Sequence, residues 1–496
     1  MGKLKKLVGD TAIYGLSSII GRFLNYLLVP LYTYKIAAES GGYGVVTNIY
    51  AYTALILVIL TFGMETTFFR FANKEGVNPL KAFSTSLISV GGVALIFIAL
   101  CTVCLPWISD PLGYADHPEY IEMMAIVVAI DAFQAILFAY LRYQKRPIKF
   151  AALKLLFIFL NIGMNLFIFL LAPKMCEWCP SLMGWYNPSY QVGYIFVVNL
   201  ICTSLITFGF LPELKALRNG FDSKLMKEMW KYTWPLLIFG IIGIMNQVAD
   251  KICYRFIVPG QEGETQLGIY GACVKIAMIM AMITQAFRFA YEPIVFAGVK
   301  DKDQYEMYEQ AMKYFIIFTL LAFLMVVGYL DILKFLIGED YWSGLRVVPI
   351  VMAAEIMMGI YFNLSFWYKI IDKTIWGAWF SGLGCLVLIA VNLIFVPKYG
   401  FVACAWGGFA GYGVAMVASY FIGQEHYPLN YPLKDIALYT MIAALAFAVM
   451  MFLRDDLPLW LSLAVNTILI LLFLAVIIKR DLPLSKLPVI GKYFKK

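Results

Sequence analysis

Long apolar segments alternate with short polar connections along the whole of this 496-residue chain. A helix needs about 20 apolar residues to cross a bilayer, and fourteen segments are of that length. The predicted spans are 10–31, 43–64, 82–107, 121–143, 150–172, 191–211, 232–257, 267–291, 312–331, 345–369, 375–396, 401–422, 434–453 and 458–478. The connections are too short to fold as separate domains. The pattern therefore predicts an all-α, polytopic membrane protein with about 14 transmembrane helices.

The composition supports this class, because 62% of the residues are hydrophobic and only 14% are charged. Soluble domains contain roughly 25% charged residues. We expect the first segment to be a span rather than a cleaved signal peptide, since it carries Arg22 and leads directly into further spans.

Basic residues are concentrated on alternate connections, which predicts an orientation. With the N-terminus inside, the inner connections and the tail hold 29 of the 39 Lys and Arg residues. The outer connections hold six, namely Lys35, Lys174, Lys334, Arg346, Lys398 and Arg454. We predict that both termini are cytoplasmic, and we attribute the net charge of +8 to topology rather than to nucleic-acid binding. The basic tail is expected to lie on membrane lipids.

A weak internal repeat relates the first six spans to the next six. Matched pairs lie 224 to 227 residues apart: Gly44 with Gly268, Asp131 with Glu355, and Asn165 with Asn392. An even number of spans per copy predicts halves of the same orientation, related by an axis along the membrane normal. The predicted parts are an N-lobe at 1–211, a cytoplasmic linker at 212–231, a C-lobe at 232–422, and two further spans with the tail at 423–496.

Three short features together resemble a known family. They are the Tyr43-Gly44 turn, the spacing from Gly63 to Arg70, and the segment NLIFVPKYGFVACAW at 392–406. The chain is similar to Wzx-type polysaccharide (O-antigen and capsule) flippases of the multidrug/oligosaccharidyl-lipid/polysaccharide exporter superfamily. It departs from the family's G-x-x-G-A-A junction, since the second glycine is absent from residues 401–405.

The resemblance implies two six-helix lobes around a central cavity that opens alternately to each side. It also implies transport of an undecaprenyl-diphosphate-linked oligosaccharide across the bacterial inner membrane, driven by an ion gradient or by the membrane potential. The glycan and its product (lipopolysaccharide O-antigen, capsule or exopolysaccharide) are left open, as is the choice between H+ and Na+. We expect a monomer.

Cations within or at the ends of spans are the candidate substrate-binding residues. Arg22 lies about 12 residues into the first span, where a guanidinium is costly unless it faces protein or a wet cavity. Several cations suit a diphosphate, since Arg offers paired donors to phosphate oxygens and Lys a point charge. The candidates are Arg22, Lys275, Arg255, Arg288 and Arg70. The alternative for Arg70, Arg255 and Arg288 is that they extend to lipid headgroups at the ends of their spans.

Acidic residues in the spans are the candidate ion-coupling residues, namely Asp131, Glu355, Asp250 and Glu65. Asp131 and Glu355 occupy matching positions in the repeat, which favours a shared role for them. Structural pairing with a cation is the alternative, and for Asp250 the neighbouring Lys251 is an obvious partner.

Other function classes lack their signals in this sequence. No P-loop is present, which argues against an ATP-driven motor, and the only histidines are His117 and His426. We predict no catalytic residue and no cofactor. We also predict no metal site, because the CxxC pairs at 101–104 and 176–179 have no histidine nearby. A disulfide between Cys176 and Cys179 is left open. The remaining alternative is a cation-coupled multidrug antiporter, which would favour carboxylates where this chain has Arg22.

Overall fold

The computed structural model describes residue 24 and residues 26–481, apart from 179–180, 182–183, 298–302, 372 and 455. Every regular element in these ranges is a helix, and 13 of the helices are long and apolar enough to cross a membrane. The first predicted span lies mostly outside the described residues, so the 13 agree with the sequence analysis. The prediction of an all-α polytopic fold is confirmed.

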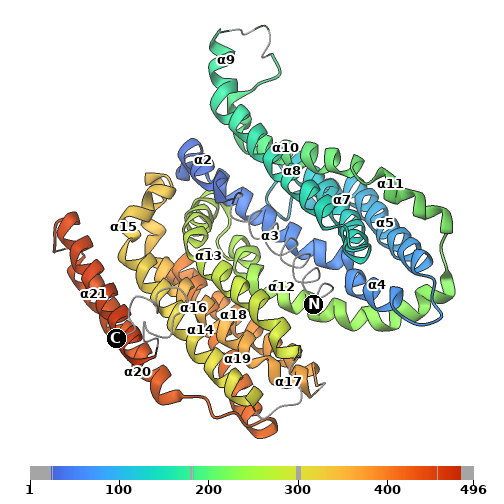
Figure 1. Cartoon of the computed structure of the whole chain (residues 1–496). Helices are drawn as coiled ribbons and strands as arrows, with labels where there is room; N and C mark the ends of the chain where they lie inside the picture. The colour runs from blue at the N-terminus through green and yellow to red at the C-terminus, as the bar shows by residue number, and fades with distance from the viewer. Residues whose placement is uncertain are drawn as a thin grey trace. The chain divides into compact units, whose positions relative to one another are not determined.

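The helices pack into two compact units, and unit 1 comprises Met1–Ala272 and Leu388–Cys404. Its described helices are α2 (Leu28–Lys35), η1 (Ala38–Ser40), α3 (Gly42–Thr61), α4 (Met64–Ala72), α5 (Pro79–Val103), α6 (Leu105–Ser109), α7 (Pro118–Tyr143), α8 (Pro147–Leu166), η2 (Phe167–Leu171), α9 (Ala172–Trp178), η4 (Pro188–Tyr190), α10 (Gln191–Phe208), α11 (Leu211–Leu214), η5 (Lys215–Asn219), α12 (Ser223–Ile257) and the start of α13 (Gly260–Ala297) (Figure 1). Proline begins α5, α7 and α8, where its missing N–H costs nothing.

The core of unit 1 is an aromatic and aliphatic cluster where α4, α5 and α7 meet. Phe68, Phe83 and Tyr140 lie at its centre, and the rings of Phe83 and Tyr140 stack with centroids 3.8 Å apart. Such pairs add about 0.5–1.5 kcal/mol beyond the area that they bury. The cluster therefore gives α4 a fixed seat against α5 and α7.

The second predicted span is broken into α3 and α4 at Phe62 and Gly63. Both residues have positive φ, 35° at Phe62 and 73° at Gly63. A Cβ on Gly63 would lie 2.7 Å from the Cβ of Leu236, so glycine is required by the backbone and by the space. The break changes the direction of α4, which carries Glu65 and Arg70.

The helices α3 and α13 approach each other at two glycines that the sequence repeat matches. A Cβ on Gly268 would lie 2.9 Å from the backbone nitrogen of Gly44, and a Cβ on Gly44 would lie 1.9 Å from the carbonyl oxygen of Glu264. Only glycine permits such close packing of two helices. Both glycines belong to unit 1, so this contact holds α3 against the start of α13.

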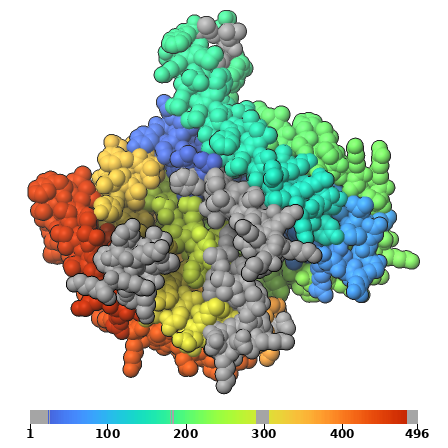
Figure 2. Space-filling model, viewed as in Figure 1, coloured from blue at the N-terminus to red at the C-terminus, as the bar shows by residue number. Residues whose placement is uncertain are grey.

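The helix formed by α8, η2 and α9 extends well beyond the rest of unit 1. Pro147–Trp178 contains 32 residues, or roughly 48 Å at 1.5 Å per residue, against a hydrocarbon core of about 30 Å. Its end stands out from the surrounding helices of the unit (Figure 2). Trp178 is 80% exposed there. The first residues of the predicted loop at 173–190 are therefore helical, since α9 ends at Trp178.

Unit 2 comprises Cys273–Val387 and Ala405–Lys496. Beside the rest of α13, it contains α14 (Asp303–Gly328), α15 (Leu330–Leu333), η6 (Lys334–Leu336), η7 (Glu339–Val347), α16 (Val348–Leu364), α17 (Phe366–Ile370), most of α18 (Ile375–Tyr399) and of α19 (Phe401–His426), α20 (Leu433–Leu453) and α21 (Leu459–Arg480). The units reflect packing, whereas the lobes were predicted from a repeat, so the lobe boundaries stay a prediction. The last nine residues of the predicted linker are helical, since α12 begins at Ser223.

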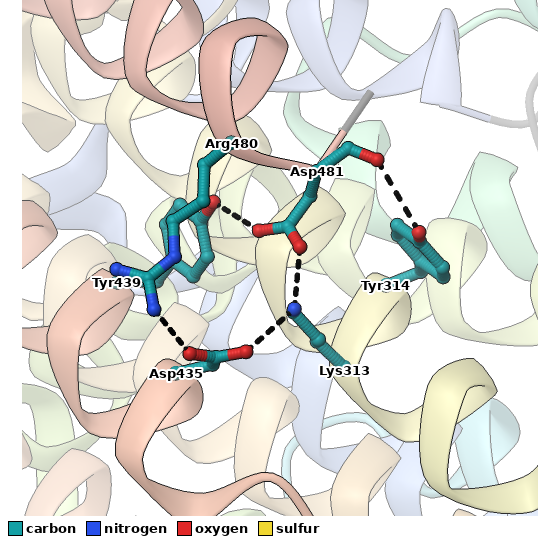
Figure 3. A network of polar contacts seen from close by, with 6 residues as sticks. All are labelled: Lys313, Tyr314, Asp435, Tyr439, Arg480 and Asp481. Carbon is teal, nitrogen blue, oxygen red and sulfur yellow. Dashed lines mark hydrogen bonds and ion pairs between the residues drawn. The ribbon is translucent and has the colours of Figure 1, made fainter. Parts of the chain in front are cut away.

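Charged side chains attach the hairpin of α20 and α21 to α14 (Figure 3). Lys313 Nζ lies 2.7 Å from Asp435 Oδ2 and 2.5 Å from Asp481 Oδ1, and the Lys313 side chain is only 7% exposed. Arg480 pairs with Asp435, and the hydroxyl of Tyr439 donates to Asp481. One buried ammonium therefore joins the first turn of α20 to the end of α21.

A second charged contact holds the other end of the same hairpin. Arg454, directly after α20, donates to both carboxylate oxygens of Asp331 at 2.8 and 3.1 Å. Between these ends, the amide of Asn466 donates to the carbonyl oxygen of Gly328 at 2.8 Å. The two helices outside the repeat are thus bound to α14 and α15 at both ends.

Candidate functional site

Arg22, the most deeply placed cation in the sequence analysis, lies outside the described residues. Its role in binding substrate stays a prediction. The described candidates are spread over both units, and each unit is considered by itself.

Arg255 is held in place near the end of α12. Its Nη2 donates to the carbonyl oxygen of Gly113 at 2.7 Å, it pairs with Glu264, and its guanidinium carbon lies 3.8 Å from the ring centroid of Tyr114. Burial raises the pKa of Tyr114, so the neutral phenol donates to Asn48 at 2.8 Å. These contacts give Arg255 a bracing role between α12, α13 and the loop before α7.

Arg70 is on α4 and lies beside the start of α12, whereas Arg255 is near the end of that helix. The guanidinium carbon of Arg70 is 4.1 Å from the ring centroid of Tyr232, in a cavity that also contains Lys74 and Lys231. Tyr232 and Arg255 are roughly 34 Å apart along α12 at 1.5 Å per residue. A single diphosphate therefore cannot contact Arg70 and Arg255 together in this structure.

Asp250 is paired, as the structural alternative anticipates. Both of its carboxylate oxygens lie 2.9 Å from Lys251 Nζ, and the Tyr270 hydroxyl donates to Oδ2 at 2.7 Å. Asp250 is 6% exposed, so these bonds replace the hydrogen bonds to water that a carboxylate loses on burial. Its role as an ion-coupling residue stays a prediction.

Two candidate acids, Asp131 and Glu65, belong to one network of charges in unit 1. Glu65 on α4 accepts a hydrogen bond from Arg142 on α7 at 2.6 Å. Lys154 on α8 interacts electrostatically with Asp131, Glu65 and Arg142. The ammonium of Lys154 also lies 4.1 Å from the ring centroid of Phe138. Glu65 thus has an ion pair with Arg142, and Lys154 lies within electrostatic range of both acids.

Lys154 is the member of this network that sequence reasoning missed. It lies within the predicted span 150–172 but was counted with the basic residues of the preceding connection, and α8, which begins at Pro147, places it about two turns into the helix. The sequence contained a signal for its depth, because proline favours the first turn of a helix and Pro147 therefore marks where α8 begins. A basic residue two turns after such a proline lies at membrane depth.

A chain of hydrogen-bonded amides and phenols runs through unit 1, and all of its members except Tyr50 are buried. Tyr32 donates to Asn165 at 3.0 Å, and Asn165 donates to the Asn161 side chain at 3.1 Å. Asn161 donates to Asn199 at 3.4 Å, and Asn199 donates to the hydroxyl of Tyr50. Four helices, α2, α8, α10 and α3, are linked by it.

The amide chain ends at Tyr50, which lies within electrostatic range of Asp131. The repeat does not reproduce the chain in its second copy. Asn165 and Asn392 are both buried, with 0% and 1% of their surfaces exposed. Asn165 is hydrogen-bonded, whereas the amide atoms of Asn392 have no hydrogen-bond partner among the described residues. The first copy thus contains the continuous polar path.

The remaining candidates belong to unit 2. Lys275 is half-buried on α13, and Glu355 is half-buried on α16. Arg288 is exposed, with its guanidinium carbon 5.0 Å from the ring centroid of Phe362. Lys275 and Arg288 are roughly 20 Å apart along α13 at 1.5 Å per residue, so they lie at different depths.

Comparison with known proteins identifies the family. A family described as polysaccharide biosynthesis protein matches residues 7–294, which is more than half of the chain. The chain belongs to this family. The match confirms the resemblance to polysaccharide flippases at the family level. A curated relative, Lsg locus putative protein 1 of Haemophilus influenzae, is 19% identical over 344 residues, which cover 68% of this chain and 78% of the relative.

Solved structures share the fold of this family member. The lipid II flippase MurJ, in an inward closed conformation, matches with a TM-score of 0.69 at 15% identity, over 94% of this chain and 98% of its own. An inward-facing multidrug resistance MATE transporter of the MOP superfamily matches with a TM-score of 0.61 at 13% identity, over 84% and 94%. The family match and the shared fold agree with the prediction of a membrane transport protein rather than an enzyme.

Proposed function

We propose that this protein is a flippase that moves an undecaprenyl-diphosphate-linked oligosaccharide from the cytoplasmic to the outer leaflet of the bacterial inner membrane. The family match over residues 7–294 carries the proposal. The fold likeness to a lipid II flippase supports it. Cations at both ends of α12 and on α13 suit a substrate with a diphosphate, since guanidinium groups bind phosphate oxygens through paired donors.

A multidrug antiporter is the second candidate, because transporters of the MATE family share the fold. The test compares two activities of the same purified protein in vesicles. We expect translocation of a fluorescent lipid-linked oligosaccharide and no movement of a cationic dye such as rhodamine 6G. Dye transport without lipid translocation would overturn the flippase proposal.

The proposed orientation places both termini in the cytoplasm and the loop at 173–190 outside. Cys176 lies in this loop, so the test starts from a variant with Cys176→Ser and Cys179→Ser. A membrane-impermeant maleimide added to intact cells should then label Ser181→Cys and spare Lys224→Cys. The parent variant controls for the remaining thiols, and lysed cells confirm that Lys224→Cys can react. The reverse pattern would contradict the orientation.

We infer that Asp131 couples transport to an ion gradient through the polar path that begins at Tyr50. Asp131→Asn is expected to reduce the dependence of translocation on a proton or sodium gradient by roughly tenfold or more, since the charge that binds the ion is lost. Glu355→Gln tests the matching position in the second copy. The measurement is the translocation rate in vesicles with and without each gradient.

The control for Asp131→Asn addresses its electrostatic partner. If Asp131 only neutralises Lys154, the combined variant Asp131→Asn with Lys154→Met should restore both abundance and gradient dependence. If Asp131 binds the ion, the combined variant should restore abundance alone. Normal gradient dependence in Asp131→Asn, per inserted molecule, would exclude the coupling role.

A further inference from the structure

A basic cavity opens in unit 1 between the end of α4 and the start of α12. Its volume is about 310 Å³. It is lined by Arg70, Phe71, Lys74, Glu228, Lys231 and Tyr232. Pockets that bind small molecules have volumes of about 300–1,000 Å³, so this cavity has room for a phosphate-bearing group.

The lining of the cavity has an excess of positive charge. Three of the six residues are cations and one is a carboxylate. Lys74 Nζ lies 2.9 Å from Glu228 Oε2, but both side chains are more than half exposed, so this pair is weak and can rearrange. Arg70 and Lys231 form no ion pair in the part of the chain that the structure describes. The exposed charges of Arg70 and Lys231 are therefore accessible to an anion.

Arg70 is held in an orientation that suits an oxyanion. Its guanidinium lies over the Tyr232 ring, with 4.1 Å from Cζ to the ring centroid. Stacking restrains the plane of the guanidinium and leaves the N–H groups at its edge able to donate. Phe71, which is 5% exposed, fixes the neighbouring backbone in the core of the unit. The donor is thus partly ordered before any ligand binds.

Exposed tryptophans place this cavity at the level of the lipid headgroups. Trp230 and Trp234, one turn apart on α12, are 47% and 50% exposed. Tryptophan is enriched where membrane spans meet the headgroup region. Trp230 also packs against Phe62, with ring centroids 5.7 Å apart, so the break between α3 and α4 lies beside it. A ligand of the cavity would have apolar surface next to it.

We propose that the cavity formed by Arg70, Lys74 and Lys231 binds the phosphate or diphosphate head of an anionic lipid in the inner leaflet. Two lipids share this chemistry, an anionic phospholipid and the lipid-linked substrate. The inference rests on the proposed orientation of the protein. Its test measures binding and not translocation, so failure of the cavity and failure of the flippase assignment give different results.

The test is native mass spectrometry of the full-length protein in detergent, titrated separately with four probes. They are phosphatidylglycerol, phosphatidylcholine, undecaprenyl diphosphate and inorganic diphosphate. Arg70→Gln and Lys231→Gln should each weaken binding of an anionic lipid about tenfold, as expected for one lost charge-assisted hydrogen bond. Phosphatidylcholine, a zwitterion, should bind equally to all variants.

Matched controls come from the same helix. Lys224 and Lys227 are exposed on α12 but do not line the cavity, so Lys224→Gln and Lys227→Gln remove the same charge elsewhere. Arg70→Lys is a milder variant, because it keeps the charge and loses only the paired donors. It should fold where Arg70→Gln fails, and it should still weaken binding several-fold.

The outcomes separate the sources. Weaker binding of undecaprenyl diphosphate alone supports a substrate entry site, and weaker binding of phosphatidylglycerol as well supports a general headgroup site. Weaker binding of inorganic diphosphate would show that the cavity recognises the head without its lipid. Unchanged affinities in the cavity variants, or equal losses in the Lys224 and Lys227 variants, would overturn the proposal.

Discussion

Replacement of Lys313 by methionine is expected to destabilise the attachment of the α20–α21 hairpin to unit 2. The ammonium of Lys313 lies within 2.7 Å of both Asp435 and Asp481, and its side chain is only 7% exposed. Without it, two carboxylates share a confined site, and among the described residues only Asp435 retains a cation, Arg480. Removing one partner of a buried ion pair costs about 3–5 kcal/mol.

The measurement is the thermal unfolding midpoint of the purified protein, together with protease sensitivity of the connection before α20. Lys434→Met is the matched control, because Lys434 is exposed and adjacent to Asp435. Adding Asp435→Asn and Asp481→Asn to Lys313→Met should recover part of the lost stability, since the uncompensated charges are gone. Equal midpoints for Lys313→Met and Lys434→Met would contradict the attachment.

The spans could be predicted from the sequence because hydrophobic length is a local property that the bilayer imposes directly. The break at Phe62 and Gly63 could not, since residues 43–64 form one uninterrupted predicted span, and the close approach of Leu236 to Gly63 comes from a distant part of the chain. Gly44 and Gly268 were singled out only as matched positions of the predicted repeat. Their positions in the repeat were visible, although their contact was not.

The candidate site was predictable only as a set of residue types. Depth along a span follows from numbering, but the partner of a charge is decided by neighbouring helices. Asp131 was recognised, whereas Lys154 on α8 was assigned to a connection. Arg70 and Arg255 were grouped because both are basic residues at span ends. In the structure Arg70 lies beside the start of α12 and Arg255 near its end, so the length of that helix separates them.

The largest functional effect is expected at Arg22. A guanidinium at the centre of a span costs about 2.5–3.5 kcal/mol on insertion scales, so it should be retained for a use. If Arg22 holds the diphosphate by two parallel hydrogen bonds, Arg22→Lys keeps the charge but loses the paired donors. Translocation should then fall at least tenfold in Arg22→Lys and further in Arg22→Leu, while insertion stays normal.

The assay for Arg22 is complementation of a flippase-deficient strain that is supplied with the matching sugar pathway, normalised to inserted protein. Lys398→Leu is the control, because Lys398 is an exposed basic residue at the end of α18. A bracing role predicts a different pattern: tolerance of Arg22→Lys, and low abundance of Arg22→Leu with normal transport per molecule. Full complementation by Arg22→Leu at equal abundance would remove Arg22 from the substrate site, and the cations of α12 and α13 would then be the remaining candidates for the diphosphate.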